Sequence, residues 1–156
     1  MNTFSNTDYG TLREVDERDC DLLYQWTNDM EVRRNSFSTS RIKYEDHVRW
    51  FRSKLNDKAC CMFILTIDNH DVGLIRIDIV NGNGIISYSI CSNFRERGYG
   101  FKIIKLLEHK IEKQHMKLKQ LHAEVKHNNI ASQKIFKKLG YEEKVIRDKL
   151  FYKKTL

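Results

Sequence analysis

The sequence contains no proline, and it has no hydrophobic run of the roughly 20 residues that a membrane-spanning helix needs. Its first six residues, from Met1 to Asn6, lack the basic start and the apolar stretch of a secretory signal. No Gly/Ser-rich linker and no internal repeat interrupts the 156 residues. A chain of this length suits one hydrophobic core. We therefore expect a single cytoplasmic domain, residues 1–156, with no membrane partner.

Spacings typical of zinc sites are also missing. The four cysteines, at positions 20, 60, 61 and 91, form neither a CxxC pair nor a Cys/His pattern suited to zinc. Buried cysteine in a reducing compartment behaves as a small hydrophobic residue. We therefore expect free thiols and no metal.

Positive charge is in excess, but it is not clustered. The net charge is +7 and the pI is about 9.2, which suits nucleic acid, an anionic membrane surface or a polyanionic small molecule. Acidic and basic residues alternate along most of the chain, as in 108–113, and no basic tail is present. Dispersed bases make a poor footprint for DNA or RNA, so we expect no nucleic-acid partner.

The spacing of hydrophobic residues divides the chain into helices and strands. It predicts helices at 17–28, 44–55, 100–114 and 129–139, and strands at 11–15, 60–67, 72–80, 85–91 and 121–125, with one or two more within 142–154. Asn81-Gly82 predicts a tight hairpin, because that turn needs positive φ, and Gly140 predicts a left-handed helix end. The order predicts a mixed α/β fold, in which a mostly antiparallel central sheet is flanked by about four helices.

Two glycines, Gly98 and Gly100, lie between a predicted strand and a predicted helix. They allow the backbone to turn tightly and to approach a ligand closely. The amides of this turn and of the first helical turn then converge on a nest that suits a pyrophosphate. A plain turn before a helix would use the same residues, so this pattern alone leaves both interpretations open.

A second segment runs from a strand into Asn129 and a helix that carries Phe136 and ends at Leu139-Gly140-Tyr141. In order and spacing, the two segments resemble the paired signatures of the GNAT acetyltransferases over about residues 85–141. The resemblance implies a single-domain GNAT fold whose strands splay apart at the acetyl-CoA site. It also implies direct transfer of acetyl from acetyl-CoA to a primary amine.

The resemblance assigns cofactor contacts position by position. The backbone at Ile90 would pair with the pantetheine amides, 95–101 would hold the pyrophosphate, and Asn129 would contact the pantetheine arm, which it could do while also capping its helix. The expected acetyl-CoA residues are Ile90, Ser92, Arg95, Arg97, Gly98, Tyr99, Gly100, Phe101, Asn129 and Phe136.

The sequence departs from the family at one functional position. The family often has a tyrosine at the position of Phe136, and that tyrosine protonates the leaving thiolate. A phenyl ring cannot donate a proton, so either another group does so or the thiolate leaves unaided.

Two residues are candidates for the catalytic base. Glu124 lies five residues before Asn129, where some family members carry a catalytic glutamate, although a surface carboxylate on an alternating strand is the other interpretation. His47 could act directly or through water, and its alternative is a structural histidine on an apolar helix face.

Segments 26–34 and 44–51 resemble the GNAT branch that acetylates nucleotide-linked 4-amino sugars in surface-glycan synthesis. They are similar, less closely, to the ribosomal-protein N-terminal acetyltransferases. The expected acceptor-binding residues are Arg33, Arg34, His47, Trp50, Arg76 and Asp78. On this resemblance we favour the amino sugar. Its diphosphate would need cations, and Arg33, Arg34 and Arg76 are the candidates, because the arginine fork suits phosphate oxygens. An N-terminal protein acetyltransferase and a non-catalytic acyl-CoA sensor remain alternatives, and the sequence allows a homodimer.

Overall fold

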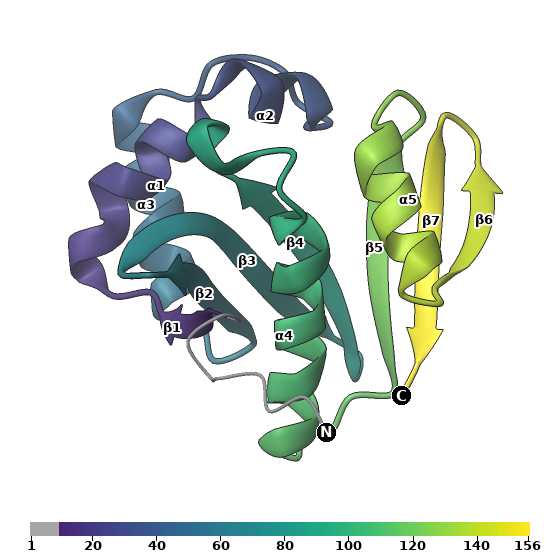
Figure 1. The fold of residues 1–156 in the computed structure, drawn as a ribbon. Coiled ribbons are helices and arrows are strands. Elements are labelled where there is room, and N and C mark those ends of the chain that lie inside the picture. The colour runs from purple at the N-terminus through teal and green to yellow at the C-terminus, as the bar shows by residue number, and fades with distance from the viewer. Residues whose placement is uncertain (1–9) are drawn as a thin grey trace.

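The computed structural model describes residues 10–156, and the first third of these is mostly helical (Figure 1). Strand β1 (Thr11–Glu14) leads into a 3-10 turn, η1 (Glu17–Asp19), where Asp16 and Asp19 form a reciprocal capping box. Helices α1 (Cys20–Thr27), α2 (Met30–Asn35) and α3 (Tyr44–Leu55) follow. The helix expected at 17–28 is thus divided into η1 and α1. Helix α2 was not predicted, because it buries no side chain fully and so lacks an apolar stripe.

The remaining elements follow the predicted order closely. They are β2 (Cys60–Ile67), β3 (His70–Val80), β4 (Asn83–Ile90), η2 (Ser92–Phe94), α4 (Tyr99–Lys113), β5 (Gln120–Lys126), α5 (Ile130–Lys138), β6 (Glu142–Ile146) and β7 (Lys149–Thr155). Asn81 and Gly82 have φ of 52° and 80°, and Gly140 has φ of 84°. The predicted hairpin turn and the left-handed end after α5 are therefore confirmed.

The seven strands form one sheet in the order β1-β2-β3-β4-β5-β7-β6. Every neighbouring pair is antiparallel except β4 and β5. These two parallel strands pair only from Asn83 to Ile85, whereas β4 continues to Ile90 and stays paired with β3 to its end. Strands β4 and β5 therefore diverge, as Figure 1 shows, and the expected splay in a mostly antiparallel α/β sheet is confirmed.

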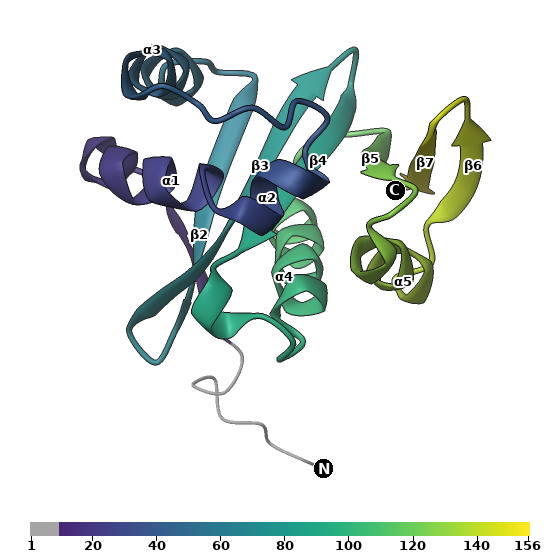
Figure 2. The ribbon, with the colours of Figure 1, turned by 90° about the horizontal axis from the view of Figure 1, so that it is seen from above.

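Two hydrophobic cores hold the helices against opposite faces of the sheet. The larger core joins α4 and α5 to one face through fully buried side chains such as Ile75, Ile104 and Phe136. The smaller core joins α1 and α3 to the other face around Leu23 and Ile64. Figure 2 shows this layering, with α2 lying beside the end of β4. The gap between β4 and β5 therefore lies between strands and helices that the larger core holds in place.

The described chain contains no helix that combines the length and the apolar character needed to cross a membrane. All four cysteines are free thiols, as expected, and burial raises the pKa of Cys60 to about 11.

Candidate active site

A cleft of about 640 Å³ lies where β4 and β5 diverge. Its walls come from these two strands and from β3, from the loop before α4, from the first turns of α4 and α5, and from residues 27–37, here called the α2 segment. The predicted cofactor residues that line it are Ile90, Arg95, Gly98, Tyr99, Gly100, Asn129 and Phe136. Ser92 and Arg97 are exposed outside this lining, and Phe101 lies beneath Lys138, whose Nζ is 4.7 Å from the ring centroid. The structure therefore brings most of the predicted cofactor site together.

The start of α4 forms one end of the cleft, where the sequence predicts the cofactor. Gly98 adopts φ of 82°, and among residues 10–156 no side chain caps this helix. Gly100 sits in the first turn, where an added Cβ would lie 2.8 Å from Ile135 Cδ1 and 3.4 Å from Tyr88 Cε2. Because glycine has no Cβ, position 100 lets α4 pack close to α5, and it leaves the backbone of this turn accessible to a ligand. Uncapped amides at a helix start suit an anionic group such as a pyrophosphate.

The cleft-facing edge of β4 offers backbone groups to a ligand. Residues 86–90 pair with β3 on one side, and β5 has already diverged on the other. An extended arm that carries amides can pair with such an edge as an added strand does. Asn129 lies across the cleft, where its Oδ1 accepts a hydrogen bond from the Ser132 amide at 3.2 Å. Asn129 therefore caps α5 and faces the cleft at the same time.

Arg95 braces the α2 segment against the loop that precedes α4. Its guanidinium donates to Asp29 Oδ1 at 2.5 Å, forms an ion pair with Glu31 Oε2 at 2.8 Å, and donates from Nε to the Ile90 carbonyl at 3.0 Å. Burial favours a higher pKa for Asp29, but Arg95 and the backbone amides of Val32 and Glu31 outweigh it and hold that pKa below its usual value. The guanidinium of Arg95 is thus held by protein groups, and it fixes the loop that precedes α4.

Glu124 is the carboxylate on the β5 wall of the cleft. It is an exposed residue, and its Oε1 lies 2.9 Å from Lys149 Nζ. Lys149 Nζ also lies 5.6 Å from the ring centroid of Phe37, which follows α2. A carboxylate held in this way can accept a proton from an amine in the cleft, either directly or through one water.

His47 lies outside the cleft, in the smaller core. It is 2% exposed, and its ring packs among Tyr24, Trp50 and Phe51. Its Nε2 is 2.8 Å from the Cys20 carbonyl, and because a carbonyl only accepts, Nε2 must carry the proton. This geometry is that of a structural histidine that ties α3 to α1, so we assign His47 no part in the reaction.

The arginines expected to bind the acceptor have different environments. Arg33 lines the cleft, but its guanidinium donates to the carbonyls of Thr27 and Ser38, and burial lowers its pKa. Arg34 is exposed and pairs with Glu31 at 3.4 Å, outside the lining. Both guanidinium groups therefore bind protein groups in this structure.

Arg76 has the most favourable position of the three arginines. It lines the cleft on β3, donates to Asp78 Oδ2 at 2.8 Å and to Ser87 Oγ at 3.4 Å, and lies 5.3 Å from the Trp50 ring centroid. Asp78 also accepts from Lys54 at 2.6 Å. Asp78 and Trp50 do not line the cleft, but they orient the arginine that does.

Several cleft residues were missed from the sequence. Tyr88 was not singled out from the sequence, although its hydroxyl lies 2.6 Å from Ser132 Oγ at the start of α5. Glu31 and Phe37 belong to the α2 region, which has no readable periodicity. A hydroxyl on an otherwise aliphatic strand face, next to a predicted splay, was the signal that could have identified Tyr88.

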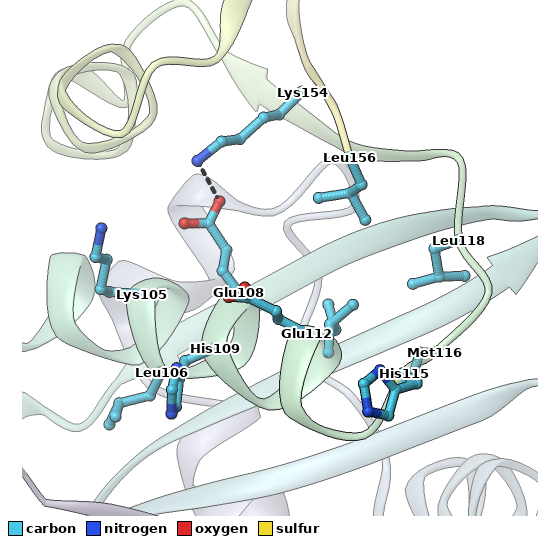
Figure 3. A pocket seen from close by; sticks show the side chains of 11 residues that line it. Lys105, Leu106, Glu108, His109, Glu112, His115, Met116, Leu118, Lys154 and Leu156 are labelled. Atoms are coloured by element: carbon cyan, nitrogen blue, oxygen red, sulfur yellow. Dashed lines mark hydrogen bonds and ion pairs between the residues drawn. The ribbon is translucent and has the colours of Figure 1, made fainter.

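A second cavity, of about 720 Å³, lies along the C-terminal half of α4 (Figure 3). Leu106, Met116, Leu118 and Leu156 line it, with the Glu108–Lys154 ion pair at 2.8 Å on its wall. This cavity is larger than the cleft, but neither of the two sequence motifs contributes a residue to its lining. The smaller cleft is therefore the candidate active site, because it joins the helix start, the open strand edge and the carboxylate.

The splayed strands and the open start of α4 agree with the acetyl-CoA site that the resemblance to the GNAT acetyltransferases implies. Residues 11–142 match the family model of the acetyltransferase (GNAT) domain. The chain therefore belongs to the GNAT family, and it is an acetyl-CoA-dependent N-acetyltransferase.

Solved structures with the same fold include three N-acetyltransferases crystallised with coenzyme A. Spermidine N-acetyltransferase from Vibrio cholerae, bound to CoA and spermine, is 14% identical with a TM-score of 0.82, over 94% of this chain and 95% of that one. AAC(6')-Ib with ribostamycin and coenzyme A is 16% identical with a TM-score of 0.82, over 95% and 94%. RimL, a ribosomal L7/L12 alpha-N-protein acetyltransferase, is 13% identical with a TM-score of 0.80, over 93% of each chain. No curated protein sequence matches this chain.

Proposed function

We propose that this GNAT enzyme acetylates the amino group of a nucleotide-linked amino sugar. The observation that carries the proposal is the position of Arg76 on the cleft wall, oriented by Asp78 and Trp50 and next to the hydroxyl of Ser87. A fixed guanidinium suits a diphosphate, and neighbouring hydroxyls suit a sugar. The excess of positive charge in the chain agrees with an anionic acceptor.

The α2 segment favours a small acceptor over a polypeptide. It is tied to one side of the cleft by Arg95, and to the other side by Lys126, whose Nζ donates to the Arg34 carbonyl at 2.9 Å. A segment anchored on both sides restricts access to the acceptor end. Acetylation of protein N-termini, the second candidate, would require a path for an extended chain beneath or beside this segment.

In the proposed reaction, acetyl-CoA supplies an activated acyl group, and the protein provides orientation and proton transfer. The amides at the start of α4 would hold the pyrophosphate, and the free edge of β4 would align the pantetheine arm. Glu124 would take a proton from the acceptor ammonium, directly or through water, because only the neutral amine is a nucleophile.

The test is coenzyme A release with a panel of acceptors, which comprises nucleotide-linked amino sugars, the matching free amino sugars, N-terminal peptides, spermidine and aminoglycosides. We expect the highest kcat/KM for a nucleotide-linked sugar. Arg76→Ala should raise its KM about tenfold or more while leaving acetyl-CoA affinity unchanged, since a charge-assisted hydrogen bond contributes about 1.5–3 kcal/mol. Equal kcat/KM for the free sugar and its nucleotide conjugate would contradict the proposal, and turnover of peptides alone would favour the second candidate. No turnover with any amine, despite acetyl-CoA binding, would favour an acyl-CoA sensor.

A further inference from the structure

The cleft lacks a proton donor at the helix position where the family often has one. Phe136 is 1% exposed and stacks on Tyr141 and Tyr152, with ring centroids 5.0 and 5.3 Å away. When the thioester is cleaved, the sulfur receives the electron pair of the broken C–S bond. Departure of an unprotonated thiolate is unfavourable, so a nearby O–H group that can protonate the sulfur would lower the barrier.

A hydroxyl pair lies one helical turn from Phe136. Tyr88 Oη on β4 and Ser132 Oγ on α5 are 2.6 Å apart, and both residues line the cleft. The Tyr88 ring packs edge-on against Phe136, with ring centroids 6.2 Å apart. A Cβ built on Gly100 would lie 3.7 Å from Tyr88 Oη. The pair therefore bridges the diverging halves of the sheet at the first turns of α4 and α5.

The surroundings of this pair keep Tyr88 protonated and hold its partner in place. Burial raises the pKa of Tyr88, and the hydrogen bond with Ser132 acts in the opposite direction. Ser132 is 8% exposed, and its amide is fixed by Asn129. If Ser132 Oγ donates to Tyr88 Oη, the tyrosine O–H is free to point into the cleft. The same hydrogen bond then stabilises the phenolate that remains after proton transfer.

We propose that Tyr88, supported by Ser132, donates the proton to the leaving sulfur of coenzyme A. This inference rests on the proposed acetyl transfer. The amine lone pair forms the C–N bond, the C–S bond breaks with its electron pair going to sulfur, and Tyr88 Oη gives the sulfur a proton. The acetylated nitrogen releases one proton to water, and water reprotonates Tyr88, so the proton count balances. Tyr88 is thus the acid, and Ser132 is a positioning residue.

The test compares Tyr88→Phe with Tyr152→Phe. Both replacements remove one buried phenol hydroxyl that is hydrogen-bonded at 2.6 Å, but Tyr152 bonds to Glu143 and does not line the cleft. We expect Tyr88→Phe to lower kcat about 100-fold or more and Tyr152→Phe to leave kcat within about twofold. Ser132→Ala should lower kcat about tenfold, because Tyr88 keeps its proton but loses the donor that stabilises its phenolate.

A second readout needs only bound coenzyme A. The thiol of bound coenzyme A is titrated by its ultraviolet thiolate absorbance in each variant that retains the wild-type circular dichroism. Without the Tyr88 hydroxyl the thiolate loses its donor, so the pKa of the bound thiol should rise in Tyr88→Phe and stay unchanged in Tyr152→Phe. An unchanged thiol pKa in Tyr88→Phe, or an unchanged kcat, would overturn the assignment. If Tyr88→Phe does not fold, an unchanged kcat in folded Ser132→Ala would overturn it. Failure of the wild type to turn over any amine would instead contradict the acetyl transfer itself, because the thiol titration does not depend on an acceptor.

Discussion

At the end of the cleft where we place the cofactor, the groups that face the cavity are backbone amides and an open strand edge. At the acceptor end they are charged side chains. Arg76 pairs with Asp78 on its own strand β3, and Glu124 of β5 pairs with Lys149 of β7. Backbone groups at the cofactor end are exposed by glycine and by the divergence of β4 from β5. The acceptor end depends on side-chain pairs, and two of them, Lys54–Asp78 and Glu124–Lys149, join residues far apart in the sequence.

This difference means that the two ends should respond differently to mutation. The cofactor end should be sensitive to backbone conformation and tolerant of side-chain changes such as those at the exposed Arg97. The acceptor end should be sensitive to the removal of single charges. The following predictions test this contrast, in order of their expected effect on acetyl transfer.

Glu124→Gln should have the largest effect. If the Glu124 carboxylate is the base, its amide replacement should lower kcat about 10²- to 10⁴-fold, because glutamine cannot accept the amine proton. Acetyl-CoA affinity, measured by calorimetry, should not change. Glu142→Gln is the control, since Glu142 is an exposed carboxylate on β6 that also pairs with a lysine, Lys153, at 3.8 Å. A Glu124→Gln enzyme with the original kcat would assign the base to solvent.

Gly98→Ala should have the next largest effect, and it should act through acetyl-CoA. Gly98 and Gly140 have φ of 82° and 84°, and an added Cβ would meet nothing within 4 Å at either position. The strain of alanine at positive φ should therefore lower the unfolding free energy of each variant, Gly98→Ala and Gly140→Ala, by about 1–2 kcal/mol. Only Gly98→Ala should also weaken acetyl-CoA binding, by about 10- to 100-fold, because relaxation of the strain turns the amides away from the pyrophosphate. Equal acetyl-CoA affinities in the two variants would disprove this role for the loop.

Arg95→Met should loosen the α2 segment and raise the acceptor KM several-fold. It removes the guanidinium from Asp29 and Glu31, which should lower the unfolding free energy by about 1.5–3 kcal/mol at neutral pH. The pKa of Asp29 is lowered in the folded state. The ionised carboxylate therefore adds to the unfolding free energy above the unfolded-state pKa of about 3.9, and this stabilisation is lost as the pH falls through the folded-state pKa. The stability difference between wild type and Arg95→Met, measured by urea unfolding, should therefore narrow below about pH 4. A difference that does not depend on pH would mean that Arg95 acts by packing alone.

Arg49→Met is the matched control for this prediction. Arg49 pairs with Asp46 on the exposed side of α3, where both side chains are more than half exposed. Its removal should change stability and KM much less, because an exposed ion pair is screened by solvent.

The same contrast explains what the sequence could predict. The hairpin at Asn81-Gly82, the helix end at Gly140 and the left-handed turn at Gly98 depend on local backbone preferences, which glycine and hydrophobic spacing reveal. The engagement of Arg95 by Asp29, 66 residues earlier, follows from the tertiary fold and has no local signal. For the same reason, Arg33 was expected at a ligand, whereas its guanidinium binds backbone carbonyls. Tyr88 was missed because its partner, Ser132, is 44 residues later in the sequence, and a strand pattern does not reveal such a contact.

Replacement of His47 should have the smallest effect on acetyl transfer, although the residue was a candidate base. Its Nε2 donates to the Cys20 carbonyl within the smaller core, so His47→Phe leaves that carbonyl without a side-chain donor while keeping an aromatic ring. The loss should lower the unfolding free energy by about 1–3 kcal/mol. His47→Gln carries an amide N–H at a similar reach and should recover part of that stability. Both folded variants should keep kcat within about twofold of the wild type at a temperature well below their melting points. A catalytic histidine would give the opposite result, in which phenylalanine and glutamine both abolish the proton transfer and lower kcat about 100-fold or more, whatever their stability. Urea unfolding and coenzyme A release, measured on the same protein preparations, therefore distinguish a residue that ties α3 to α1 from one that takes part in the reaction.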